Sequence, residues 1–158
     1  MKKAFLTIVT LVIATTLISC GGSAPAAATG TPDATIAANL TKQLDGVTIQ
    51  EFPFNSARFF KVEDVKAIDS KVKAVAGSAD FKAINKKGYK LYVIGHNDQW
   101  EKNGSVGLAR AKAVSNELRG LGVDPKVLAT KNAFDKEMVK DQSKQHPIQR
   151  RVTFKVMK

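Results

Sequence analysis

Hydrophobic and polar positions divide the chain into three parts. Residues 4–18 are mostly apolar, residues 21–39 are small or polar without an apolar period, and from residue 40 onward apolar residues recur at regular spacings. Apolar residues three or four positions apart line one face of a helix, and alternating ones line one face of a strand. The pattern predicts a leader over residues 1–19, a tether over residues 20–39 and one folded domain over residues 40–158.

Helices and strands alternate within the predicted domain. Helical spacing occurs over residues 62–76 and again over residues 104–119. The residues of the second helix that we expect in the core are Val106, Ala109, Ala113, Val114 and Leu118. Strands are predicted over residues 47–54, 89–94, 127–130 and 151–156. This order predicts an α+β fold, a mixed β-sheet with helices packed on one of its faces.

The leader has the features of a bacterial signal peptide. Two lysines precede the apolar run, which is shorter than the roughly 20 residues that a membrane-spanning helix needs. The run ends in Leu17-Ile18-Ser19-Cys20, which resembles the lipobox of bacterial lipoproteins, and Cys20 is the only cysteine of the chain. The resemblance implies that Cys20 carries a diacylglycerol anchor, with Gly21 favouring the outer membrane and a domain facing the periplasm. An ordinary secretory signal with an incidental cysteine is the alternative.

Composition and charge limit the classes of molecule that the protein is expected to bind. The net charge is +11, so the surface attracts polyanions such as cell-wall peptides, anionic lipid headgroups or nucleic acid. Charge alone does not choose among them, and improved solubility is a sufficient explanation for it. An exported chain argues against nucleic acid, so we expect none as a partner. Residues 20–39 bury too little apolar surface to fold and would supply reach from the lipid.

Four segments of the domain resemble motifs of OmpA-like peptidoglycan-binding domains. They are residues 52–57 (FPFNSA), 92–98 (YVIGHND), 103–111 (NGSVGLARA) and 149–152 (QRRV). Each follows the order of the family and falls on its expected strand, loop or helix. The resemblance implies an OmpA-like βαβαβ(α)β fold and non-covalent binding of the stem peptide of peptidoglycan.

The resemblance also implies a site. The ligand of the family is typically diaminopimelate, whose free end carries an ammonium and a carboxylate. Asp98 matches the residue that accepts from the ammonium, and Arg110 matches the one that forks onto the carboxylate. Asn103 is expected to brace the pocket, Asn55 to add polar contacts, and Arg150 to line the pocket or hold Asp98. The loop after Asp98 is about three residues shorter than is usual for the family.

Other interpretations of these residues stay open. Asp98 and Arg110 could form a purely structural ion pair. Trp100 could stack on a sugar or simply pack at a loop tip, and His96 is better explained as a hydrogen-bonded loop residue than as a metal ligand. The short loop also raises a second function, a structural or protein-interaction lipoprotein that keeps the fold and has lost the wall ligand. Stem peptides with ornithine or lysine would lack the carboxylate that Arg110 needs.

The sequence offers no support for catalysis. It has no serine nucleophile motif, no zinc-ligand spacing, no matched pair of carboxylates and, once Cys20 is lipidated, no free thiol. We therefore expect a binding module without enzymatic activity, cofactor or metal. Its partners would be peptidoglycan, the membrane through Cys20, and other envelope proteins.

Overall fold

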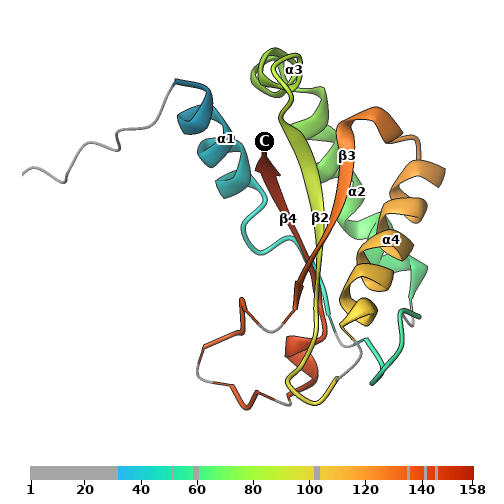
Figure 1. Cartoon of the computed structure of the whole chain (residues 1–158). Coiled ribbons are helices and arrows are strands. Elements are labelled where there is room, and N and C mark those ends of the chain that lie inside the picture. Colours follow the sequence, from blue (N-terminus) through green and yellow to red (C-terminus); the bar gives the residue numbers. More distant parts are fainter. Residues whose placement is uncertain are drawn as a thin grey trace, which may run out of the picture.

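The computed structural model describes residues 32–50, 52–58, 61–101, 104–134, 136–140, 142–144 and 146–158. Its helices are α1 (Pro32–Gln43), α2 (Val62–Gly77), α3 (Ala79–Asn85) and α4 (Ser105–Gly120), with short 3₁₀ turns η1 (Pro125–Val127) and η2 (Pro147–Gln149). Its strands are β1 (Thr48–Ile49), β2 (Lys90–His96), β3 (Leu128–Phe134) and β4 (Val152–Met157). The predicted α+β class is confirmed (Figure 1).

The strands form one mixed sheet in the order β1-β4-β2-β3. β2 runs parallel to β3, with Leu91 opposite Leu128, and antiparallel to β4, with Val93 opposite Phe154. The prediction that the strand near residues 89–94 is internal is confirmed, because β2 has a neighbour on each side. The β2–β3 connection passes through α4, as a crossover between parallel strands requires.

The core lies between the sheet and the helices, with buried residues from α1, α2, α3 and α4. β4 alternates, with Val152, Phe154 and Val156 buried as predicted. In α4 the buried face includes Arg110, Ala111, Val114 and Leu118, whereas Ala109 is exposed. The face of α4 that packs on the core therefore differs from the predicted one, which included Ala109 and Ala113. The prediction was wrong there because Arg110, a charged residue, takes a core position.

Two glycines let α4 approach β2 closely. A side chain at Gly95 would overlap the backbone carbonyl of Gly107, and one at Gly107 would overlap the amide oxygens of Asn97 and Asn132. Gly95 lies near the end of β2 and Gly107 in the first turn of α4. The contact brings the start of α4 against the loop that follows β2, which is where the predicted site residues lie.

The folded part begins earlier than predicted. α1 occupies residues that the sequence analysis assigned to the tether, up to residue 39. Ala37 and Leu40 are buried, and Ile36 packs against the core. The Thr41 hydroxyl accepts from the Val156 N–H at 2.9 Å, so α1 covers the edge of β4 beyond the two-residue strand β1. The boundary at residue 40 is therefore corrected to Pro32, and residues 1–31, which include Cys20, lie outside the described part.

Strand lengths also differ from the predictions. Only Thr48 and Ile49 of the predicted strand 47–54 pair as a ladder, although the Phe52 N–H donates to the Arg150 carbonyl at 3.2 Å. Pro53 has no N–H to donate, so a regular ladder does not continue through it. The strand predicted over residues 127–130 is longer and extends to Phe134.

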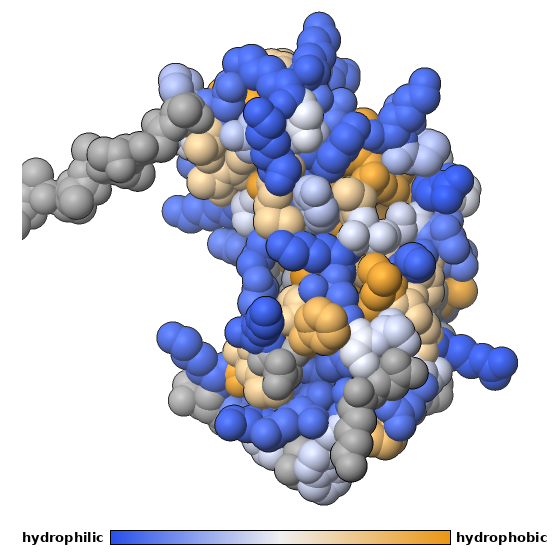
Figure 2. Space-filling model, in the orientation of Figure 1, coloured by the Kyte–Doolittle hydropathy of each residue, from blue (hydrophilic) through white to orange (hydrophobic). Residues whose placement is uncertain are grey.

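The surface in view is mostly hydrophilic and carries scattered apolar residues (Figure 2). It is hollowed between α1 and the loop that leads from β3 to η2. A groove of about 320 Å³ lies at this loop, where Thr48, Glu137, Ile148 and Lys155 are among the lining residues. In the described part of the chain, no helix combines the length and the apolar character needed to cross a bilayer.

Candidate carboxylate-binding site

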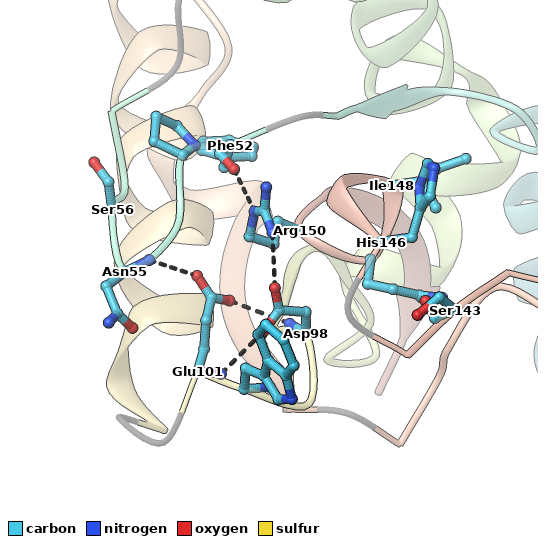
Figure 3. A network of polar contacts seen from close by, with 12 residues as sticks. Phe52, Asn55, Ser56, Asp98, Glu101, Ser143, His146, Ile148 and Arg150 are labelled. Carbon is cyan, nitrogen blue, oxygen red and sulfur yellow. Dashed lines mark hydrogen bonds and ion pairs between the residues drawn. The ribbon is translucent and has the colours of Figure 1, made fainter.

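The site lies where three loops meet at the end of β2. The first loop follows β1 and carries Asn55 and Ser56, the second follows β2 and carries Asp98 and Glu101, and the third precedes β4 and carries Arg150 (Figure 3). Arg110, on the buried face of α4, completes the site. The predicted loops are thus brought together, although Asn55 and Glu101 are 46 residues apart in sequence and Asp98 and Arg150 are 52 residues apart.

Arg110 is fully buried and uses every N–H of its guanidinium. Its Nε donates to the Ser56 carbonyl at 2.9 Å, Nη1 to the His96 carbonyl at 2.9 Å, and Nη2 to the Pro53 carbonyl at 3.0 Å. The other two N–H groups go to the two carboxylate oxygens of Glu101, Nη1 at 2.7 Å and Nη2 at closer range. A guanidinium has five donors, so all are satisfied within the chain. The guanidinium carbon also lies 5.4 Å from the centre of the Phe52 ring.

The Glu101 carboxylate is the point on which the donors converge. Besides the two N–H groups of Arg110, its Oε1 accepts from the Asn55 N–H at 2.8 Å and its Oε2 from the Asp98 N–H at 3.1 Å. Neither the Glu101 nor the Arg110 side chain is exposed to solvent. A bidentate Arg fork flanked by two backbone N–H groups is a receptor for one carboxylate. We call these four donors the carboxylate cradle.

Asp98 is held by a different partner. Its Oδ2 pairs with Nη1 of Arg150 at 2.7 Å, and its Oδ1 accepts from the N–H groups of Trp100 and Glu101 at 2.9 and 3.0 Å. Arg150 also donates from Nε to the Phe52 carbonyl at 2.7 Å. The Arg150 side chain is 13% exposed and that of Asp98 is 1% exposed. The site thus contains two anions and two cations that neutralise each other.

The structure places the predicted residues as follows. Asp98 and Arg110 lie in adjacent parts of one network, linked through Glu101, but each has its own internal partner. The expectation that Arg150 holds Asp98 is confirmed. Asn55 contributes its backbone N–H from a left-handed conformation, with φ of 51°. Asn103 lies outside the described residues.

Glu101 is the residue that sequence reasoning missed. The signal for it is local: Asp98 is followed three residues later by an acid, and an Asp side chain commonly accepts from the backbone N–H groups two and three residues on. Such a turn at Asp98 brings the Glu101 side chain back toward the start of the loop. The short loop after Asp98 therefore carries its own carboxylate into the cradle.

Two further candidates have clear surroundings. Trp100 is 61% exposed at the tip of the loop. His96 is buried, and its Nε2 lies 2.8 Å from the Thr153 hydroxyl. Burial and, after it, the positive charge of Arg151 lower the pKa of His96 from 6.5 to about 4, against the opposing effect of Glu137. His96 is therefore neutral at pH 7.

Within the described residues, no three His, Cys, Asp or Glu side chains converge as a metal site would require.

Comparison with solved structures identifies the fold. The C-terminal domain of MotB from Helicobacter pylori is similar over 70% of this chain and 84% of that chain, with 17% identity and a TM-score of 0.51. The OmpA-like domain of FopA1 from Francisella tularensis subsp. tularensis matches over 69% and 73% of the two chains, with 22% identity and a TM-score of 0.49. The peptidoglycan-associated lipoprotein from Burkholderia pseudomallei matches over 70% and 89%, with 16% identity and a TM-score of 0.47.

The folded part of the chain therefore has the OmpA-like fold that its four sequence motifs predict. No protein-family model matches the sequence, and no curated protein sequence matches it. The fold alone does not assign a ligand, because one fold hosts several functions.

Proposed function

We propose that this protein is a non-catalytic, lipid-anchored module that binds the stem peptide of peptidoglycan and tethers the outer membrane to the cell wall. The bound group would be of the diaminopimelate type, which carries a carboxylate and an ammonium on one carbon. The anchor would be the lipid on Cys20, and the domain would face the periplasm.

The observation that carries this proposal is the carboxylate cradle. Two N–H groups of Arg110 and the backbone N–H groups of Asn55 and Asp98 converge on a single carboxylate position. An arrangement of this kind, in a water-excluded position, binds a carboxylate far better than a surface arginine does. The cradle lies beside the Asp98 carboxylate. This carboxylate would accept a hydrogen bond from the ligand ammonium in place of the one that it now accepts from Arg150.

The surrounding charges suit such a ligand. Asp98 offers an anion to the ligand ammonium and Arg110 offers a cation to the ligand carboxylate, so the site matches a zwitterionic group rather than a simple anion.

The proposal is tested by co-sedimentation of the purified chain with insoluble peptidoglycan. Arg110→Lys keeps the charge and removes the fork, and Asp98→Asn keeps the shape and removes the anion. We expect each to reduce the bound fraction at least about tenfold, since a lost charge-assisted hydrogen bond costs about 1.5–3 kcal/mol. Arg119→Lys, at the opposite end of α4, is the matched control and should bind as the wild type does. Undiminished binding by both folded site variants would refute the site.

A second function is favoured by one observation. Arg110 is fully buried and all its donors are used, so the cradle is closed in this structure. A structural or protein-interaction lipoprotein that has lost the wall ligand would have such a closed site. This second function predicts that neither the wild type nor a variant that lacks the Glu101 side chain co-sediments with peptidoglycan.

A further inference from the structure

We propose that Glu101 is an internal competitor for the carboxylate cradle: its side chain holds the position of a ligand carboxylate and must leave before such a ligand binds. Glu101 thereby sets the affinity and the selectivity of the site. This inference rests on the proposed function for the identity of the external ligand, whereas the competition itself is a property of the cradle.

The contacts of Glu101 are those of a bound ligand. Both oxygens are engaged, each by one N–H of Arg110 and one backbone N–H, from Asn55 for Oε1 and from Asp98 for Oε2. In Figure 3 the carboxylate points between Asn55 and Asp98. An external carboxylate in this position would make the same four hydrogen bonds, so the exchange leaves the cradle fully satisfied.

The position of Glu101 in the fold makes the exchange feasible. Glu101 lies in the loop between β2 and α4, outside any helix or strand. Its backbone is held by the turn at Asp98, through the carbonyl and Oδ1 of Asp98. The preceding residues Gln99 and Trp100 are exposed. Movement of Glu101 therefore breaks no helix or strand hydrogen bond, and a carboxylate released into water regains its hydration.

Competition of this kind has a quantitative consequence. If the open cradle is populated only as a small fraction, the apparent affinity for a ligand carboxylate falls by that fraction. A ligand without a carboxylate gains nothing from displacing Glu101. The internal carboxylate therefore penalises stem residues that end in a zwitterion and leaves stem residues that end in a plain ammonium unaffected.

The first experiment tests the cradle without any wall ligand. Glu101→Ala removes Cγ, Cδ and both carboxylate oxygens of the side chain, and acetate has the same set of heavy atoms. We expect acetate to raise the melting temperature of this variant in a saturable manner, beyond sodium chloride at equal ionic strength and beyond acetamide. The wild type and the Glu117→Ala control should show no such response. If Glu101→Ala is unfolded in plain buffer, acetate-dependent recovery of its far-ultraviolet circular dichroism is the equivalent result.

The second experiment tests the competition with ligands. Titration calorimetry compares two synthetic stem tripeptides in which every carboxyl group outside the side chain of the third residue is amidated. In one the third residue is meso-diaminopimelate, whose side chain ends in a zwitterion, and in the other it is lysine, whose side chain ends in an ammonium alone. Glu101→Gln, which keeps the size of the side chain and removes its charge, should bind the diaminopimelate peptide at least about tenfold more tightly than the wild type. Its affinity for the lysine peptide should be unchanged.

The outcomes separate this inference from the proposed function. Acetate rescue without binding of either peptide by any variant would leave the cradle in place and refute the proposed function. Peptide binding that is equally tight in the wild type and Glu101→Gln, with no acetate effect on Glu101→Ala, would refute the competition and leave the function standing. Acetate rescue together with tighter diaminopimelate binding supports both.

Discussion

Glu101 and Arg110 form an ion pair in which both side chains are 0% exposed. A charge removed from water loses several kcal/mol of hydration, which is regained only if good geometry and further hydrogen bonds compensate. Here the compensation is complete: three carbonyls complete the guanidinium, and two backbone N–H groups complete the carboxylate. The pair therefore joins the loops after β1 and β2 to α4.

Removing one member of this pair should destabilise the fold strongly. Glu101→Ala leaves Arg110 as an uncompensated buried cation, and we expect a loss of about 3–5 kcal/mol in the free energy of unfolding, measured by urea denaturation. The double variant Glu101→Ala/Arg110→Met removes both charges and should recover part of that loss. Glu117→Ala, a half-buried residue near the end of α4, should stay within about 0.5 kcal/mol. A double variant as unstable as Glu101→Ala alone would contradict this description of the pair.

The contact between α4 and β2 predicts an unusual response to alanine. Replacing a helical glycine by alanine is ordinarily favourable by up to about 1 kcal/mol. At Gly107 and Gly95 the added methyl group would overlap neighbouring atoms, so we expect a loss of about 1–3 kcal/mol in thermal or urea unfolding. Gly77→Ala is the matched control, because nothing lies near a Cβ there, and it should leave stability unchanged or raise it. Equal effects at Gly107 and Gly77 would be inconsistent with the close approach.

α1 should contribute to stability through Thr41. The hydroxyl of Thr41 accepts from the Val156 N–H and lies 3.4 Å from the Val156 carbonyl, at an edge of β4 that β1 does not reach. Thr41→Val keeps the shape and leaves that N–H without its acceptor, at a cost of about 1–3 kcal/mol. Thr35→Val, on the exposed side of α1, should be close to neutral. If the two substitutions are equivalent, α1 does not cover the sheet edge as described.

His96 should make the fold sensitive to acid. Its pKa is about 4 in the folded chain against 6.5 for an unperturbed histidine, because burial and the charge of Arg151 disfavour the imidazolium. As the pH falls below 6.5, the unfolded chain takes up the proton first. The stability that His96 contributes is therefore fully present above pH 6.5 and is lost as the pH falls toward 4, by about 3 kcal/mol.

The comparison that isolates this effect uses two variants. His96→Gln should show a smaller drop in the free energy of unfolding between pH 7 and pH 4.5 than the wild type does. His146→Gln, which replaces the other histidine, should retain the wild-type drop. Carboxylates that titrate in the same range are common to all three chains and cancel in the difference. An unchanged drop in His96→Gln would contradict the assignment.

Much of the fold could be predicted from the sequence because its elements are strongly patterned. The alternation of Val152, Phe154 and Val156 and the spacing of Val65, Val72 and Val75 indicate the buried faces of β4 and α2 directly. α1 was missed because its apolar residues lie among alanines and a proline, in a composition typical of a tether. What marks it is the four-residue spacing of Ile36, Leu40 and Leu44.

The sequence motifs predicted which elements form the site, but they did not predict how its charged residues pair. Motifs placed Asp98, Arg110 and Arg150 on loops and a helix that do converge. The pairing of the two arginines with the two acids depends on the complete burial of Arg110 and on the turn at Asp98. Residue spacing predicts neither of them. Glu101 therefore had no assigned role until the loop geometry placed its carboxylate opposite Arg110.

The most direct test of the carboxylate cradle as a stem-peptide site is chemical-shift mapping of the ¹⁵N-labelled chain with the meso-diaminopimelate tripeptide. The wild type and Glu101→Gln are titrated in parallel. We predict that the backbone amides of Asn55 and Asp98 and the Nη–H groups of Arg110 shift most, and at lower peptide concentration in Glu101→Gln. Shifts confined to other surfaces, or none in either chain, would contradict the account.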